Sequence, residues 1–88
     1  MTEFKTANVD LAAALLAHDQ PLDRVETPDG LTCEFVFADT GVVTGLAAAW
    51  AAERLEVNAK RLSVANRRLR YLIRKTQGEY AVREPSEK

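Results

Sequence analysis

The sequence predicts a small α+β domain in which three short strands form a mostly antiparallel sheet that helices cover on one face. Residues 31–38 alternate apolar and polar side chains, as a half-buried strand does. One apolar stretch at helical spacing precedes this segment and two follow it. The chain has 88 residues, enough for one hydrophobic core. The expected order is therefore strand, helix, strand, strand, helix, helix in two layers.

The first two expected elements are a strand over residues 4–6 and a helix over residues 7–18. Thr6 is expected to cap the helix, because its hydroxyl can accept from a free amide of the first turn. The helix is amphipathic, with apolar side chains at Val9, Leu11, Ala12, Leu15 and Leu16. We interpret His18 as a C-terminal cap rather than a catalytic residue, since a helix C-terminus favours a cation.

A β-hairpin is expected next, with strands over residues 22–27 and 31–38. Its turn reads Pro28-Asp29-Gly30, a φ-restricted residue followed by a turn former and a residue tolerant of positive φ. The packed face of the return strand is expected to hold Leu31, Cys33, Phe35 and Phe37, and the wet face Thr32, Glu34 and Val36. Cys33 then reads as a small buried hydrophobe rather than a reactive thiol.

A helix over residues 41–54 should follow, capped by Asp39 or Thr40. Its expected inner side consists of Val42 or Val43, Leu46, Ala47, Trp50 and Ala51. We interpret Trp50 as a core residue, with anchoring of a partner as the alternative. The small residues Gly41 and Gly45 are expected to permit close helix approach rather than to form a phosphate loop, since no Lys-Ser or Lys-Thr follows them.

The last expected helix covers residues 58–77 and ends at Gly78. Its apolar seam consists of Leu62, Ala65, Leu69 and Leu72. Residues 1–78 are thus expected to form a single domain, and residues 79–88 a flexible tail. Because 14 residues are alanine, the core should be thin, and self-association as a homodimer would compensate for it.

Composition argues against several functional classes. The chain has one His, one Cys and two Ser, a poor set for acid, base or nucleophilic catalysis, so we expect no enzyme. We expect neither metal nor cofactor, since no metal-ligand spacing occurs. A single cysteine favours a reducing, cytoplasmic setting. The longest uncharged stretch has 13 residues, so neither a membrane span nor a signal peptide is expected.

Charge is strongly segregated along the chain. Residues 1–59 contain 3 basic and 10 acidic residues, whereas residues 60–76 contain seven basic and no acidic ones. Six of the seven recur every seven residues in two adjacent helical rows: Lys60, Arg67 and Arg74, and Arg61, Arg68 and Lys75. They are the candidate partner-binding or nucleic-acid-binding residues. The alternative is a solvated face neutralised by the upstream carboxylates or by a second subunit.

Four segments resemble a family of small uncharacterised domains from bacteria, phages and mobile elements. They are residues 4–6 leading into 11–16, residues 31–40 (LTCEFVFADT), Trp50, and residues 57–59 leading into 68–70. The resemblance implies the fold and a mobile-element origin, but no activity. We therefore predict a non-enzymatic module that binds a protein partner or itself. The alternative is a nucleic-acid-binding accessory protein that uses the basic helix over residues 60–75.

Overall fold

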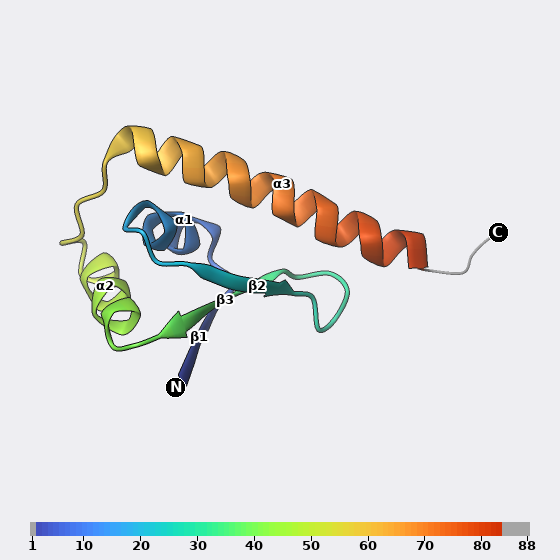
Figure 1. Ribbon diagram of the computed structural model, residues 1–88, viewed down its shortest axis with the longest axis horizontal. Coiled ribbons are helices and arrows are strands. Elements are labelled where there is room, and N and C mark those ends of the chain that lie inside the picture. The colour runs from blue at the N-terminus through green and yellow to red at the C-terminus, as the bar shows by residue number, and fades with distance from the viewer. Residues whose placement is uncertain (1, 84–88) are drawn as a thin grey trace.

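The α+β class and the predicted element order are confirmed. The computed structural model describes residues 2–83, with side-chain surroundings for residues 2–76. The elements are β1 (Thr2–Thr6), α1 (Val9–Ala17), β2 (Leu22–Glu26), β3 (Glu34–Asp39), α2 (Val42–Ala51) and α3 (Ala59–Arg83). The strands form one antiparallel sheet in the order β1-β3-β2, and α3 runs across α1 on one side of that sheet (Figure 1).

The core lies between the sheet and the helices. The central strand β3 supplies Phe35 and Phe37, both fully buried. Phe4 of β1 stands opposite Phe37, and Leu22 and Val25 of β2 stand opposite Phe37 and Phe35. These partly buried side chains pack against the same core cluster. The inward face of the sheet is therefore apolar across all three strands, as its alternation requires.

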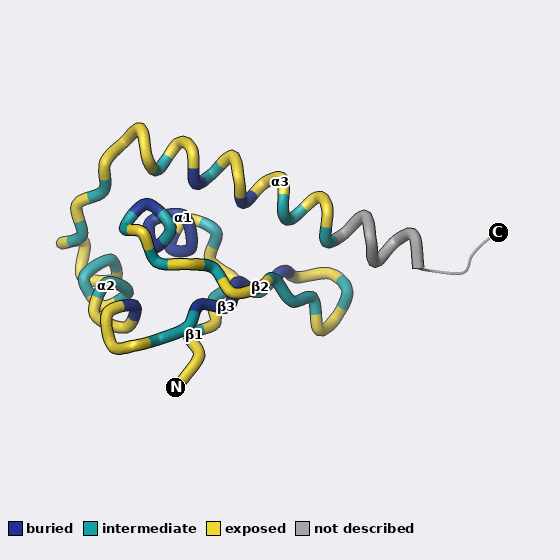
Figure 2. The backbone as a smooth tube through the Cα atoms, viewed as in Figure 1, coloured by how far each residue is buried: buried dark blue, intermediate teal, exposed yellow. Residues whose placement is uncertain are grey.

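Helix α1 is buried on almost every side, between the sheet, α2 and α3 (Figure 2). Its buried residues are Leu11, Ala12, Ala13, Ala14, Leu15 and Ala17. Short alanine side chains let the neighbouring elements approach closely, at the cost of little apolar area per residue. The seam of α3 packs onto this helix, with Leu69 fully buried and Ala65 nearly so.

Two helix starts differ from the prediction. Helix α1 is capped by Asn8, whose side chain accepts from the Leu11 amide at 3.2 Å, so Thr6 is not its cap. The Thr6 hydroxyl instead accepts from the Asn8 amide at 3.0 Å. Helix α2 begins after Gly41, and Asp39 accepts from the Gly41 amide and from the Thr44 hydroxyl. Asp39 therefore stabilises the turn into α2 from two residues before its cap.

The expectation that Gly41 and Gly45 permit close helix approach was wrong. A Cβ built at either position would meet nothing within 4 Å. Gly41 has φ +101, so its conformation rather than its size explains a glycine there. Val43 is the buried valine of α2, while Val42 and Ala51 are exposed.

The faces of the return strand were only partly predicted. Cys33, Phe35 and Phe37 are buried as expected, but Leu31 is 79% exposed because it lies in the turn before β3 begins. Val36 is fully buried, although it lies on the face expected to be wet. Its partners across the two strand pairs are Lys5 and Arg24. We attribute this burial to the stems of these two long cationic side chains, since such stems cover neighbouring apolar groups.

The last helix is longer than predicted. It does not end at Gly78, because the backbone of α3 continues through that residue to Arg83. A glycine inside a helix is disfavoured but tolerated, and it ends a helix only when it takes a left-handed conformation. The expected tail over residues 79–88 therefore begins as helix, and residues 84–88 lie outside the described residues.

Candidate functional site

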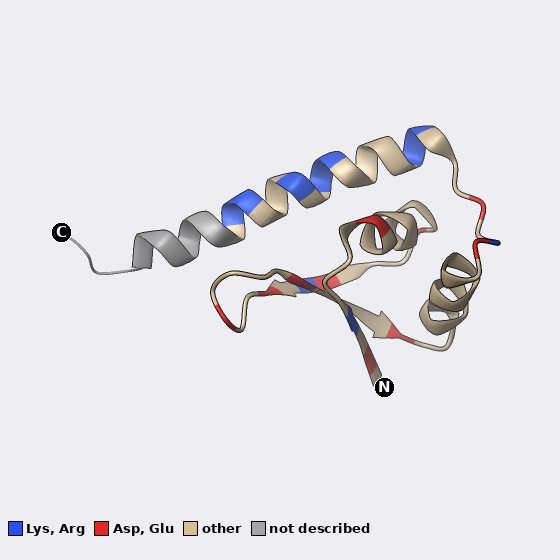
Figure 3. Cartoon of the chain, turned by 180° about the vertical axis from the view of Figure 1, so that it is seen from behind, with Lys and Arg blue, Asp and Glu red and all other residues tan. Residues whose placement is uncertain are grey.

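The six predicted residues lie on the solvent side of α3. Lys60, Arg61, Arg67, Arg68, Arg74 and Lys75 are all exposed. Figure 3 shows cations along α3, whereas the acidic residues among residues 2–76 lie on the sheet, the loops and α1. The segregation along the sequence is thus also a segregation in space. A concentrated positive surface of this kind attracts anionic partners.

The two sequence rows face different surroundings except at Lys60, which lines the groove beside α1 together with Arg61 and Arg68. Arg61, Arg68 and Lys75 line grooves between α3 and the body of the domain, with α1 at one end and β2 at the other. Arg67 lines a separate groove on the opposite flank of the helix, together with Arg70. Val64 and Tyr71 lie between the rows, three positions before one row and four before the other. They are 56% and 59% exposed.

Arg61 is held by the body of the domain. Its guanidinium donates to the Asp19 carboxylate at 3.0 Å and to the Ala17 carbonyl at 3.1 Å. Its backbone amide donates to the side chain of Asn58, which caps the start of α3. The alternative interpretation, that upstream carboxylates neutralise the basic helix, therefore applies to Arg61.

The other five candidate residues form no ion pair with a carboxylate of residues 2–76. The remaining ion pairs of that range involve Lys5 and Arg24 on the sheet. The upstream carboxylates thus leave most of the positive charge on α3 free to meet a partner.

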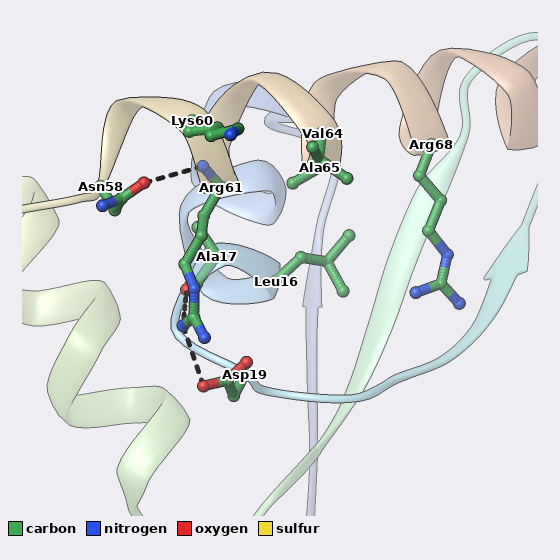
Figure 4. A pocket seen from close by; sticks show the side chains of 9 residues that line it. All are labelled: Leu16, Ala17, Asp19, Asn58, Lys60, Arg61, Val64, Ala65 and Arg68. Atoms are coloured by element: carbon green, nitrogen blue, oxygen red, sulfur yellow. Dashed lines mark hydrogen bonds and ion pairs between the residues drawn. The ribbon is translucent and has the colours of Figure 1, made fainter.

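The groove beside α1 has a mainly apolar lining. It is a cavity of about 450 Å³ between the end of α1 and the first turns of α3. Figure 4 shows Leu16 reaching into it from α1, with Val64 and Ala65 above. The Arg61–Asp19 pair lies at one end of this groove, and the Arg68 side chain lies at the opposite end (Figure 4). The arrangement combines an apolar floor with a cationic rim.

A second charged cluster lies on the helix-free face of the sheet. The Arg24 guanidinium contacts the carboxylates of Glu3, Asp23 and Glu26. Its hydrogen bonds lower the pKa of Glu3 and of Glu26, and those carboxylates raise the pKa of Arg24. Because the Arg24 guanidinium and the Lys5 ammonium together hold three carboxylates from two strands, the cluster acts as a structural clamp across β1 and β2.

The isolated His, Cys and Trp have structural roles. His18 is the C-cap residue of α1, as predicted, and its Nε2 donates to the Glu56 carbonyl at 2.7 Å. Cys33 lies in the core, and burial raises the pKa of its thiol. Trp50 packs against the core cluster. None of these side chains lines the cavity beside α1.

No known protein family, curated protein or solved structure matches this chain. Within the described residues, no helix combines the length and the apolar character needed to cross a membrane. The same part of the chain brings no three His, Cys, Asp or Glu side chains together as metal ligands.

Sequence reasoning located the cations of this surface but missed its apolar part. Val64 stands outside the apolar seam of α3, and an apolar residue on the polar side of an amphipathic helix is the signal that was available. The contributions of Leu16, Ala17 and Asp19 depend on how α3 crosses α1. Nothing in the spacing of these residues shows that crossing.

Proposed function

We propose that this chain is a non-enzymatic interaction module whose helix α3 binds an acidic surface of a protein partner. The observation that supports it is the set of exposed cations on α3 that residues 2–76 leave without a carboxylate. Six cations of α3, the five unpaired candidate residues and Arg70, have no carboxylate partner within residues 2–76. They repel one another, and an anionic partner relieves that repulsion. A second copy of the chain, whose residues 1–59 are strongly acidic, is one such partner.

Two features favour a protein over a nucleic acid. Val64 and Tyr71 place exposed apolar area between the cation rows, and protein interfaces bury such area at their centres. The remainder of the domain is acidic, with 10 acidic and 3 basic residues in residues 1–59. Nucleic-acid-binding domains are usually strongly basic as a whole, whereas this chain has a net charge of −1. The single buried cysteine is compatible with the cytoplasmic location that we propose for this module.

Nucleic-acid binding is the second proposal. It is favoured by the absence of any acidic residue from residues 60–76, which hold seven basic ones on one exposed helix. Cations along a helix neutralise phosphates, and each contact steepens the dependence of duplex binding on salt by about 0.9 in the logarithmic slope. The mobile-element origin suggested by the resemblance is compatible with both proposals and stays a prediction.

The deciding experiment is a fluorescence anisotropy titration at several salt concentrations. The probes are labelled poly-glutamate, duplex DNA and single-stranded RNA, and the protein is tested as the native chain and as Arg67→Glu/Arg68→Glu. A matched pair of single variants, Arg67→Glu and Arg54→Glu, changes the net charge equally on and off α3. Arg54 is exposed in the segment between α2 and α3.

We expect poly-glutamate to bind, with loss in the double variant and in Arg67→Glu but not in Arg54→Glu. Nucleic-acid binding with a steep salt slope and the same pattern of losses would replace the first proposal by the second. Binding of neither class at low salt would contradict both. Sedimentation of the native chain in the same buffers identifies the second copy as partner if a dimer forms that salt and Arg67→Glu both dissociate.

A further inference from the structure

The cavity between α1 and α3 has the properties of a side-chain receptor. Its volume of about 450 Å³ lies within the roughly 300–1,000 Å³ that ligand pockets span. Its walls come from two elements that the core holds rigidly, since α1 is buried and α3 is fixed to it by Leu69. A binding site on rigid elements keeps its shape in the absence of a ligand.

The floor of the cavity favours an apolar group. Leu16 and Ala17 of α1 and Ala65 of α3 line it, and Val64 stands at its rim, 56% exposed. An exposed valine beside an apolar floor leaves apolar area in contact with water. Insertion of an apolar side chain removes that area from water, at roughly 25 cal/mol per Å².

The rim favours an anionic neighbour to that group. Lys60 and Arg68 line the cavity and form no ion pair within residues 2–76. Arg61 also lines it, but its charge is matched by Asp19 at 3.0 Å. The close view places Arg68 on the far side of Leu16 from this pair (Figure 4). Net positive charge thus remains at the rim, and the floor stays apolar.

A nucleic acid matches this site less well than a peptide does. Single-stranded nucleic acids are bound by stacking their bases on aromatic side chains, and the lining contains none. Phosphate groups would meet Lys60 and Arg68, but nothing apolar on a phosphate backbone would fill the floor. An acidic peptide supplies both chemistries, since carboxylates and an apolar side chain can stand side by side along it.

We propose that this cavity receives an apolar side chain of an acidic peptide segment, whose neighbouring carboxylates pair with Arg68 and Lys60. The inference rests on the proposed function and names the chemistry of its partner. The segment carries an aliphatic or aromatic residue next to Asp or Glu. Charge complementarity at the rim holds the segment, and the apolar floor selects which residue enters.

The first test is selection from a random peptide library on the full-length chain at physiological salt. Enrichment of acidic peptides with a bulky apolar residue at a constant position is the expected result. Enrichment of acidic peptides without an apolar preference overturns the cavity proposal and leaves the proposed function standing. No enrichment of acidic peptides overturns the cavity proposal and also counts against the proposed function.

The second test measures a selected peptide on two matched pairs of variants. Val64→Glu and Val42→Glu make the same change at two similarly exposed valines, but only Val64 lines the cavity. Arg68→Glu and Arg54→Glu reverse one charge each at exposed arginines, and only Arg68 lines it. We expect the first member of each pair to bind the peptide at least roughly tenfold more weakly than the native chain does. This is the scale of one lost buried side chain or one lost charged contact.

The second member of each pair should bind nearly as well as the native chain. Equal losses within both pairs would show that the peptide senses the overall charge of the domain and not the cavity, which overturns the inference. Circular dichroism of all four variants shows whether the fold is retained. Replacing the apolar residue of the peptide by Ser tests the same contact from the side of the peptide. We expect roughly tenfold weaker binding of the Ser peptide.

Discussion

The Arg61 guanidinium lies 3.0 Å from the Asp19 carboxylate, and this contact joins the first turn of α3 to the residue that follows the C-cap of α1. The His18–Glu56 hydrogen bond at 2.7 Å lies beside it in the chain and ties the segment before α3 to the same end of α1. Together these contacts set where α3 begins its path across the domain. The cavity beside them exists because α3 starts there.

Breaking the Arg61–Asp19 pair should cost little stability. Both side chains are more than half exposed, and exposed pairs contribute about 0.2–1 kcal/mol. A double-mutant cycle with Arg61→Ala and Asp19→Ala, followed by chemical denaturation, measures the coupling between the two residues. A coupling free energy well above that range would show that the pair contributes strongly to the packing of α3 on α1. A coupling free energy of zero would show that the apolar seam alone holds α3 in place.

Leu69→Ala should destabilise the domain severely. Leu69 is fully buried where α3 crosses α1, and truncation of a buried leucine costs about 2–5 kcal/mol. Small domains have a total free energy of unfolding of about 5–15 kcal/mol, so this loss removes a large part of it. The matched control, Val64→Ala, shortens an exposed side chain of the same helix and should change the unfolding midpoint little. Equal midpoints for the two variants would contradict the placement of the seam.

Arg24 should stabilise the sheet through its stem as well as through its charge. It pairs with Glu3, Asp23 and Glu26, and it stands opposite the fully buried Val36. Arg24→Ala removes both contributions, whereas Arg24→Met keeps an apolar stem over Val36 and loses only the charge. We expect the thermal midpoint to fall in the order native, Arg24→Met, Arg24→Ala. Equal midpoints for the two variants would show that the stem does not protect Val36.

Added salt separates the electrostatic part of that effect. In both variants Glu3 and Asp23 lose their cation and Glu26 keeps only Lys5, so repulsion between these carboxylates lowers the midpoint, and salt screens that repulsion. The deficit of Arg24→Met relative to the native chain should therefore shrink at high salt. The difference between Arg24→Ala and Arg24→Met should persist, because burial of an apolar group does not depend on charge screening.

Asp39 should make the stability of the domain depend on pH in the acid range. The Thr44 hydroxyl and the Gly41 amide lower the pKa of Asp39, so the folded state favours its charged form. This stabilisation is complete above the unfolded pKa of about 3.9 and is lost as the pH falls through the folded-state value. Asp39→Asn should therefore lower the thermal midpoint at neutral pH and approach the native midpoint below about pH 4.

A midpoint difference that stays constant through the acid range would contradict this assignment. Asp29 makes a similar contribution in both proteins, since hydrogen bonds from Thr32 and Leu31 lower its pKa, so it cancels from the difference. The pKa values of Glu3 and Glu26 are lowered as well, and they cancel for the same reason.

Local sequence patterns predicted the elements but not their ends. The alternation around Phe35 and Phe37 identified the central strand, and the seam through Leu69 identified α3. The ends depend on competition between neighbouring caps, in which Asn8 rather than Thr6 starts α1 and Gly78 does not stop α3. Such choices depend on backbone conformations of single residues, which a residue type favours but does not determine.

The sequence also predicted only part of the candidate site. Residue type and heptad spacing alone placed the six cations on the exposed side of α3. The sequence left open whether upstream carboxylates neutralise these cations. In the fold Arg61 pairs with Asp19, whereas the other five have no carboxylate partner within residues 2–76. A distance between residues 42 positions apart is set by packing and not by spacing.

By itself the sequence determined the α+β class, the order of the elements and the basic character of α3, because these depend on periodicity and charge within short segments. Only the tertiary structure decided that Val36 is buried on the helix-free face, that Val64 stands beside an apolar floor and that Arg68 borders a cavity. Each of these results from contacts between elements distant in the chain. Such contacts follow from how whole faces pack together, which no local pattern specifies.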